Sequence, residues 1–346
     1  MKGRAVVMSL CSLVCLSFFI SKNELDKPMH FPDYKYNFDN NSLSPQKIAL
    51  GRALFYDPIL SKDNTISCAS CHSPFNAFAH TDHDLSHGIN DQIGTRNSSA
   101  LFNLAWQNSF MWDGAVNHLD MQPLAPITHA KEMGETIKNV LNKLRKKNIY
   151  KNLFKNAYND TIISTDRMLK AISQFQLTLI SANSKYDKTK LGLNNFNEQE
   201  KNGYKLFKNN CNSCHTEPLF TNYKFANNGL PVDTSLNDYG RWGITKLSKD
   251  SLLFKTPSLR NLSYTPPYMH DGRFKTLNQV INHYTKGIHN SFTLSEDLSN
   301  KITLSSNEKT DLITFLLTLN DKDFAFNKKH QFPREILLNN LDNSNN

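Results

Sequence analysis

The chain has 346 residues, enough for two domains of about 150 residues each. Hydrophobic residues make up 39% and charged residues 21%, a composition that excludes a polytopic membrane protein, a disordered chain and a collagen-like repeat. The 40 basic residues outnumber the 31 acidic ones, which gives a formal charge of +9. The lysines are scattered, as at 143–155 where they share a helical pattern with apolar residues. Because no recognition motif accompanies them, we expect no nucleic-acid partner.

The N-terminus has the pattern of a secretory signal. Residues 1–4 carry basic side chains, residues 6–20 form an apolar run, and polar sequence begins at Lys22. This run is too short for a comfortable membrane span, which needs about 20 residues. We therefore predict a signal over 1–22 and a periplasmic mature protein. An uncleaved anchor is the alternative, and the residues before Cys15 make a poor lipidation motif.

The first part of the mature chain reads as an arm followed by a helix. Residues 23–43 are polar and dotted with aromatic residues, which predicts an extended arm. Ser44 followed by Pro45 is a typical helix start, and the helix is expected to end before Pro58. Residues 73–130 show no long period of either kind and predict loops and short helices.

Two more helices are predicted before the middle of the chain. Apolar residues within 137–144 recur at i, i+3, i+4 and i+7, the spacing of one helix face. Thr165 is expected to cap the next helix, whose apolar residues continue to Ile180. The polar run at 183–195 then marks the predicted domain boundary.

The second half repeats the layout of the first. Asn197 and Glu200 predict a capping box at the start of a helix. Thr276 opens a later helix, and Ser305 or Ser306 opens the last one. The predicted division is a signal at 1–22, an arm at 23–43, a first domain at 44–182, a linker at 183–195, a second domain at 196–330 and a tail at 331–346.

Four cysteines indicate the cofactor. They lie in CASCH at 68–72 and CNSCH at 211–215, two copies of the attachment motif for c-type haem. A zinc ribbon is disfavoured because each pair has its own histidine and the pairs lie far apart, and a redox C-x-x-C is disfavoured because no βαβ pattern surrounds it. We predict thioethers to two haems from Cys68, Cys71, Cys211 and Cys214, with His72 and His215 as proximal iron ligands.

A helix that leads into C-x-x-C-H, followed by a helix near the domain end, is the layout of a cytochrome c domain. We therefore expect a mainly α fold of two tandem cytochrome c-like domains, each around one covalently attached c-type haem. An iron with an open or labile sixth position can bind peroxide, whereas an iron with two strong protein ligands passes electrons.

Several stretches beyond the haem motifs resemble the bacterial di-haem cytochrome c peroxidase family, which includes MauG. The resemblance spans about residues 44–325 and implies a peroxidatic N-terminal haem and an electron-transfer C-terminal haem. The stretches that carry it are GRALFYDPILS at 51–61, TRNSSALFNLAWQNSFMWDG at 95–114, QPLAPITHAKEM at 122–133, TPSLRN at 256–261 and PYMHDGRFKTL at 267–277.

The resemblance also implies a set of catalytic residues. Gln122 and Glu132 match the glutamine and glutamate that line the distal pocket of the first haem, and His129 stands where the family tends to have asparagine. A partly buried carboxyl can take a proton from one peroxide oxygen and return it to the other. Trp112 matches the tryptophan between the two haems, whereas Trp106 and Trp242 are expected to be packing residues.

The resemblance further implies a calcium ion between the domains, held largely by carbonyl oxygens and water. The matching residues are Asn97, Thr265 and Pro267. Neutral oxygen ligands suit a hard cation that is held by geometry.

The sixth ligands of the two irons are left open by the sequence. In the family, the sixth ligand of the second iron stands 14 residues after the histidine that matches His270. This position is Tyr284 here. MauG-type members also have tyrosine there, whereas typical peroxidases have methionine. Tyr284 shares a helix face with the apolar residues of 277–281, and we favour it over the nearby Met269. On the first haem, His87 is the best placed of three loop histidines, the others being His80 and His83, and an iron without a protein ligand is the alternative.

The sequence therefore favours a periplasmic cytochrome c peroxidase that reduces hydrogen peroxide with electrons from a small cytochrome or cupredoxin. The alternative is a MauG-like oxidase that modifies a partner protein by long-range electron transfer. A non-enzymatic electron carrier is disfavoured by Gln122 and Glu132. The sequence leaves homodimer formation open.

Overall fold

The structure is a computed structural model that describes residues 25–338. The predicted signal at 1–22 lies outside the described residues. Across 25–338, no helix is both long enough and apolar enough to cross a membrane.

The described chain is mainly helical, with a single short sheet, as predicted. Strands β1 (Phe225–Ala226) and β2 (Phe254–Lys255) pair antiparallel, and the many loops contain short 3-10 turns. The α-helices are α1 (Pro45–Tyr56), α2 (Cys68–Cys71), α3 (Leu124–Thr128), α4 (Ile137–Arg145), α5 (Asn148–Tyr158), α6 (Thr165–Leu177), α7 (Lys185–Lys190), α8 (Glu198–Asn210), α9 (Trp242–Thr245), α10 (Leu277–Asn282), α11 (Ser306–Leu317), α12 (Lys322–Ala325) and α13 (Arg334–Leu337).

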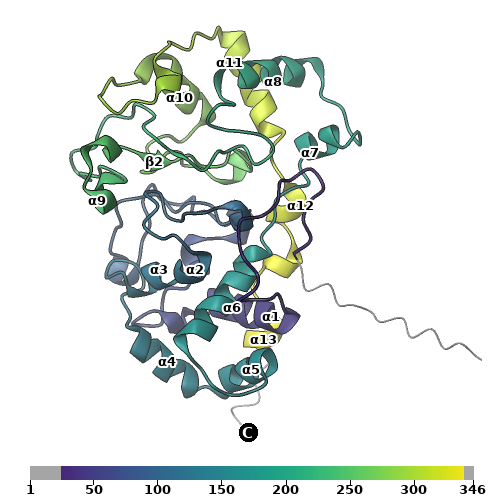
Figure 1. The fold of residues 1–346 in the computed structure, drawn as a ribbon, viewed down its shortest axis with the longest axis vertical. Helices are drawn as coiled ribbons and strands as arrows, with labels where there is room; N and C mark the ends of the chain where they lie inside the picture. The colour runs from purple at the N-terminus through teal and green to yellow at the C-terminus, as the bar shows by residue number, and fades with distance from the viewer. Residues whose placement is uncertain (1–24, 339–346) are drawn as a thin grey trace, which may run out of the picture.

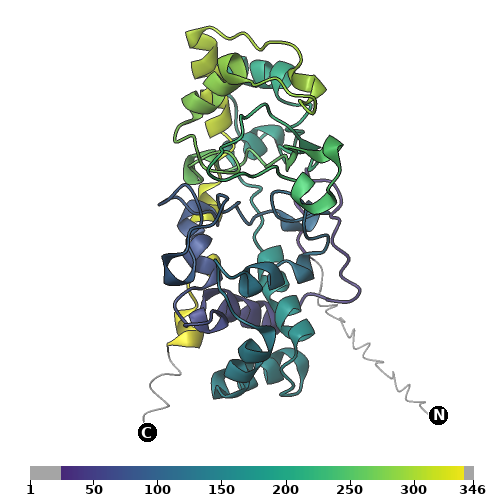
Figure 2. The ribbon, with the colours of Figure 1, turned by 90° about the vertical axis from the view of Figure 1, so that its left-hand side faces the viewer.

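Two helical halves are stacked along the long axis of the molecule (Figures 1 and 2). In the lower half α1 packs against α5 and α6, and in the upper half α8 packs against α11. A glycine sits at each of these crossings. A Cβ on Gly51 would lie 1.8 Å from the carbonyl oxygen of Ala171, and one on Gly203 would lie 1.9 Å from that of Asp311. Only glycine permits such close helix packing, and both helices lead towards a haem motif.

The helix starts follow local capping chemistry. Ser44, Asn197, Thr276 and Ser305 cap α1, α8, α10 and α11, as predicted. The prediction that Thr165 caps α6 is wrong. Ser164 has the extended backbone of a cap and its hydroxyl accepts from the Arg167 amide, so Thr165 is already helical. Ser164 and Thr165 both have a hydroxyl that can cap a helix, and in the structure Ser164 is the cap.

The segment expected as a linker contains a helix of its own. Ser184 and Asp187 form a capping box for α7 within 183–195, and both side chains are buried. Helix α11 is also not the last helix, because α12 and α13 follow it.

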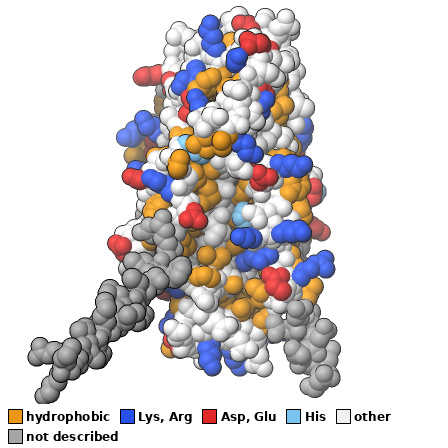
Figure 3. Space-filling model, turned by 90° about the vertical axis from the view of Figure 1, so that its right-hand side faces the viewer, with side chains coloured by type: hydrophobic (Ala, Val, Ile, Leu, Met, Phe, Trp, Pro, Cys, Tyr) orange, Lys and Arg blue, Asp and Glu red, His pale blue; other side chains and the backbone are white. Residues whose placement is uncertain are grey.

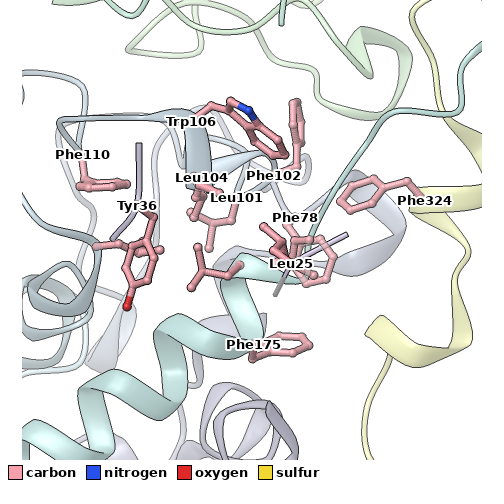
Figure 4. Packing of buried hydrophobic residues seen from close by; sticks show 14 of the residues in the cluster. Leu25, Tyr36, Phe78, Leu101, Phe102, Leu104, Trp106, Phe110, Phe175 and Phe324 are labelled. Atoms are coloured by element: carbon pink, nitrogen blue, oxygen red, sulfur yellow. The ribbon is translucent and has the colours of Figure 1, made fainter. Parts of the chain in front are cut away.

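The chain after α11 returns to the first half. The Asp321 carboxylate accepts from the amides of Ala182 and Asn183 at 2.9 and 2.8 Å. Phe324 then enters a core cluster that is otherwise built mostly from the first half, where it lies near Phe78 and Phe102 (Figure 4). The N-terminal arm supplies Leu25, Phe31, Tyr36 and Leu43 to this cluster, so both ends of the described chain complete the core of the first half.

A fully buried ion pair ties the arm to the second half. Two guanidinium nitrogens of Arg260 lie 2.7 and 2.8 Å from the Asp187 carboxylate oxygens, and His30 lies 2.8 Å from the same group. Arg260 also donates to the Pro218 carbonyl and stacks over the Phe31 ring. Burial alone would raise the pKa of Asp187, but the hydrogen bonds from Arg260 and His30 outweigh burial and hold this pKa well below its usual range.

Removing one partner of this pair should strongly destabilise the protein. Arg260→Leu leaves the Asp187 carboxylate buried without its cation, and we expect the free energy of unfolding to fall by about 3–5 kcal/mol. Denaturant unfolding of the haem-loaded protein measures the change. The matched control is Lys201→Leu, which breaks the exposed pair with Glu198 and should cost at most about 1 kcal/mol. Equal effects of the two substitutions would contradict this role of Arg260.

Candidate functional site: two haem-binding motifs and the seam between them

The first C-x-x-C-H motif forms one helical turn. Ser67 and Ser70 cap α2 reciprocally, and the His72 amide donates to the Cys68 carbonyl at 2.9 Å. The Nδ1 of His72 lies 2.9 Å from the Phe78 carbonyl, which can only accept, so Nδ1 carries the proton. Nε2 is therefore left with a free lone pair, the tautomer that an iron ligand requires.

The second motif has the same arrangement. Cys211 ends α8, and the His215 amide donates to the Cys211 carbonyl at 2.9 Å. The Nδ1 of His215 lies 3.2 Å from two carbonyls, those of Phe220 and Pro257. Both histidines are thus oriented by backbone carbonyls through Nδ1, although the motifs lie in different halves of the chain.

The electrostatics of both motifs suit c-type haem. Burial lowers the pKa of His72 and of His215 to about 4, so both imidazoles are neutral at pH 7. The four described cysteines are unpaired thiols, and burial raises the pKa of Cys68 and of Cys211 to about 12. Two free thiols and one neutral, oriented imidazole per motif are the groups that a covalently attached haem needs.

Glu132 lies within electrostatic reach of both cysteines of the first motif. Burial raises the pKa of Cys71 to about 11, and the Glu132 charge adds to the effect, which places the carboxylate within electrostatic reach of the thiol. Burial also raises the pKa of Glu132 itself, against a smaller opposing effect of His129, whose Nδ1 is 3.6 Å from the carboxylate. A carboxyl with a raised pKa holds its proton to higher pH than an ordinary glutamate, which suits a group that both takes and returns a proton.

A hydrogen bond with Gln176 fixes the orientation of the Gln122 side chain. This side chain is buried, and its Oε1 accepts from the Gln176 amide at 3.2 Å. Its amide nitrogen has only the weak acceptor Met111 Sδ, at 3.9 Å. The amide N–H groups therefore stay available to a ligand. Gln176 and Met111 were not predicted, although the polar residues at 173, 174 and 176 interrupt the apolar pattern of α6 in the sequence.

The loop histidines gather beside the first motif. The rings of His83 and His87 stack with centroids 4.1 Å apart, and His80 lies 5.5 Å from His83. The His87 carbonyl accepts from the Cys71 thiol at 3.4 Å. Gly88 follows, and a Cβ there would lie 2.5 Å from the Glu132 Cα, so this loop packs directly on the backbone of the glutamate.

A cavity of about 250 Å³ adjoins the second motif. Its lining includes the second cysteine pair, His215, Met269 and Tyr284. The face of α10 predicted to point inward does so, and the helix widens into a π-helical turn at His283–Gly287, a feature common at functional sites. His283 points elsewhere, with its Nε2 2.9 Å from the Asn228 carbonyl.

Tyr284 and Met269 both face this cavity, with Asn228 beside them. The Asn228 amide donates to Met269 Sδ at 3.4 Å. Burial raises the pKa of Tyr284 to about 12, and a hydrogen bond with Asn228 offsets part of the rise. The two candidates for the sixth ligand therefore share Asn228 as a polar neighbour.

Trp112 lies at the seam between the halves. It belongs to the first half but lines the cavity of the second, and its indole N–H donates to the Asn97 carbonyl at 2.9 Å. The Lys255 amide donates to the Trp112 carbonyl at 2.7 Å, while the Lys255 ammonium lies 2.7 Å from Gln107 Oε1. Burial lowers the pKa of Lys255 to about 7, so much of the positive charge beside Gln107 is lost near neutral pH.

The other two tryptophans differ from each other. Trp106 is buried, as predicted, and its indole donates to the Pro32 carbonyl of the arm at 2.8 Å. The prediction that Trp242 is a packing residue is wrong. Its side chain is 38% exposed in the short helix α9, where it lies beside the Lys246 ammonium.

The residues predicted for calcium all line the cavity at this seam. They are Asn97, Thr265 and Pro267. The side-chain amide nitrogen of Asn97 donates to the Asp84 carbonyl at 3.0 Å. This leaves the side-chain oxygen of Asn97 free to bind a cation. Within 25–338 no cluster of three acidic, histidine or cysteine side chains is arranged to hold a metal. A donor set of neutral oxygens is of the kind that suits a hard cation.

Comparison with known proteins relates this geometry to a family. The family model for di-haem cytochrome c peroxidase matches residues 45–195, and that for cytochrome c matches 200–320. The chain is 36% identical to the methylamine utilization protein MauG of Methylorubrum extorquens over 291 residues, covering 81% of this chain and 79% of that protein. The chain belongs to the di-haem cytochrome c peroxidase/MauG family.

Other relatives come from both branches of the di-haem family. Cytochrome c551 peroxidase of Nitrosomonas europaea is 35% identical over 237 residues, covering 67% of this chain and 70% of the relative. The crystal structure of a MauG-like protein associated with microbial copper homeostasis superposes with a TM-score of 0.81 at 30% identity, covering 90% of this chain and all but 1% of that one. The family carries two c-type haems and is an oxidoreductase family.

Loss of one thiol should reduce covalent haem in this di-haem protein. We expect Cys68→Ser or Cys211→Ser to lower the covalently bound haem by up to half, because each affects one motif. Pyridine haemochrome analysis measures the content. Ser213→Ala changes a spacer residue inside the second motif and should keep both haems. Full attachment of two c-type haems in either cysteine variant would contradict the predicted role of that thiol.

Proposed function

We propose that this protein is a periplasmic peroxidase that reduces hydrogen peroxide to water with two electrons from a small redox protein, either a cytochrome c or a cupredoxin. The overall reaction takes up two protons and two electrons and releases two water molecules. The carrying observation is the placement of Glu132 near the Cys71 thiol, with Gln122 held by Gln176. A pure electron carrier has no need of a carboxyl with a raised pKa at this place.

The haem, when bound, supplies an iron that binds peroxide and accepts electrons. In this proposal Cys68 and Cys71 hold the first haem and His72 its iron, whereas Cys211, Cys214 and His215 serve the second. Glu132 takes the proton from one peroxide oxygen and delivers it to the other, which leaves as water. The amide of Gln122 orients the peroxide by donating a hydrogen bond.

The seam residues complete the proposal. Trp112 relays electrons between the two haems, because it belongs to the first half and lines the cavity of the second. A calcium ion at Asn97, Thr265 and Pro267 would fix the carbonyl that accepts from the Trp112 indole. His87 is the candidate for a removable sixth ligand on the first iron, because its loop contacts Cys71 and its ring, stacked on His83, lies beside the first motif.

Glu132→Gln should keep both haems and lower peroxide turnover by about 100-fold or more, because shape survives while the proton-transfer group is lost. Oxidation of a reduced cytochrome c after peroxide addition measures turnover. In the unaltered protein, turnover should rise with pH as Glu132 deprotonates, at a pH above the usual glutamate range, and this limb should vanish in the variant. Glu296→Gln, at an exposed glutamate of the second half, should behave as the unaltered protein. Near-normal turnover of the Glu132 variant would remove Glu132 from this role.

A second candidate function, favoured by Tyr284, is a MauG-like oxidation of a partner protein. A phenolate on the second iron stabilises the ferric state and lowers the reduction potential, whereas a methionine raises it. An oxidised state shared between the haems through Trp112 would then suit removal of electrons from a partner. Met269 faces the same cavity and would favour the peroxidase.

The ligand of the second iron can be read from spectra. With Tyr284 as ligand, the ferric protein lacks the methionine–iron charge-transfer band at the red end of the spectrum, and Tyr284→Met raises the potential of that haem. Met269→Leu should leave the spectrum unchanged. If the unaltered protein shows the band and Met269→Leu abolishes it, Met269 is the ligand and the MauG-like candidate loses its main support.

A further inference from the structure

Helices α4 and α5 concentrate the positive charge of the chain. Residues 136–158 contain seven of the 40 basic residues and none of the 31 acidic ones. The remaining 33 basic and 31 acidic residues nearly cancel. The lysines that look scattered in the sequence therefore form a local excess that accounts for most of the net charge of +9.

The structure directs most of these cations to the solvent. The apolar face of the two helices is buried in the first half, where Val140, Leu144, Tyr150 and Phe154 are fully covered. The seventh cation, Lys143, turns inward to Glu135 and the Ser61 carbonyl. The exposed cations are Lys138, Arg145, Lys146, Lys147, Lys151 and Lys155, and we call these six residues the basic tip.

The basic tip has no carboxylate partners in the described chain. Within 25–338, none of its six side chains lies within 4 Å of an acidic group, whereas the acids that flank the segment are taken. Glu135 pairs with Lys143, and Asp160 pairs with Arg167. Unneutralised like charges held on adjacent helices repel one another, so their persistence favours an external anionic partner.

The tip occupies one end of the long axis. Helices α4 and α5 lie at the lower end in Figure 1, far from α10 and α11, and blue side chains protrude at this end of the molecule in Figure 3. Next to the tip, the loop between α5 and α6 presents Ile162 with 61% of its surface exposed. The end is convex and basic, with one apolar side chain at its edge.

We propose that the basic tip binds an anionic phospholipid surface. Five of its six cations are lysines, which are depleted at protein–protein interfaces, and it contains no aromatic anchor. A cluster of four to eight exposed lysines and arginines is, by contrast, a typical recognition element for acidic lipid headgroups. Ile162 can enter the headgroup layer beside the charges. Contact through this end would direct the second haem half away from the lipid.

The test is co-sedimentation of the purified di-haem protein with vesicles. Vesicles of phosphatidylcholine alone are compared with vesicles that also contain phosphatidylglycerol, at low and high salt. The variant carries Lys146→Gln, Lys147→Gln, Lys151→Gln and Lys155→Gln. The matched control carries Lys205→Gln, Lys246→Gln, Lys249→Gln and Lys301→Gln, four exposed lysines of the second half without a carboxylate within 4 Å in the described chain, so the net charge falls equally.

We expect the unaltered protein to bind only the vesicles with phosphatidylglycerol and to be released by salt. The tip variant should bind at least about tenfold more weakly, since each cation near an anionic surface contributes to affinity, whereas the control should bind almost normally. Haem content and peroxide turnover should be unchanged in both.

Two results would overturn the proposal. Equal losses in the tip variant and the control would show that net charge alone drives binding. A protein that ignores the vesicles but binds a small acidic redox protein through the tip lysines would make this end a protein interface instead.

Discussion

The buried pair between Arg260 and Asp187 sets the geometry on which the second haem motif depends. Arg260 donates to the Pro218 carbonyl and lies against the Phe220 ring. This fixes the short loop after CNSCH, and the Phe220 carbonyl at its end is one of the two acceptors that orient His215. An ion pair with no direct contact to the haem motif therefore supports one of the two carbonyls that orient the proximal imidazole. The cost of burying the guanidinium is offset by its four hydrogen bonds, two to the Asp187 carboxylate and two to the Pro218 carbonyl.

In the first motif the histidine is also oriented by a backbone carbonyl, but a different interaction holds that carbonyl in place. The Phe78 carbonyl that orients His72 belongs to a residue with a positive φ of 61°, in a fully buried ring of aromatic side chains. Here packing, rather than an ion pair, holds the acceptor. The shared requirement is a fixed carbonyl within hydrogen-bond reach of Nδ1, because that bond selects the tautomer that leaves Nε2 for iron. The two cytochrome c-like halves thus share the haem motif but use different interactions to hold the carbonyl that orients its histidine.

Much of the fold could be predicted because its signals are local. The caps at Ser44, Asn197 and Thr276 depend on residues within one turn, and the two haem motifs each lie within five residues. The choice between Ser164 and Thr165 could not be made, because both hydroxyls offer the same hydrogen bond. The family resemblance singled out Gln122 and Glu132 as candidates, but it gave no indication of the side chains that contact them.

What the sequence could not reveal depends on distant contacts. Gln176 stands 54 positions from Gln122, and Arg260 stands 73 positions from Asp187. Neither pair has a spacing that any helix or strand period would mark. Lys255 reads as an ordinary surface lysine until the fold places its ammonium against Gln107 and the Ser109 carbonyl. The chemistry of a residue follows from type and motif, whereas its environment follows only from tertiary packing.

The return of the chain after α11 links the folding and unfolding of the two halves. Phe324 completes the core of the first half, and the Tyr56 hydroxyl donates to the His330 carbonyl, so the earliest helix is closed by nearly the last described residues. The first half cannot reach its final packing while its closing segment is still being synthesised. The two halves are therefore expected to unfold in one cooperative transition rather than as independent domains. A chain cut short after α11 would retain both haem motifs and still lack a finished first core.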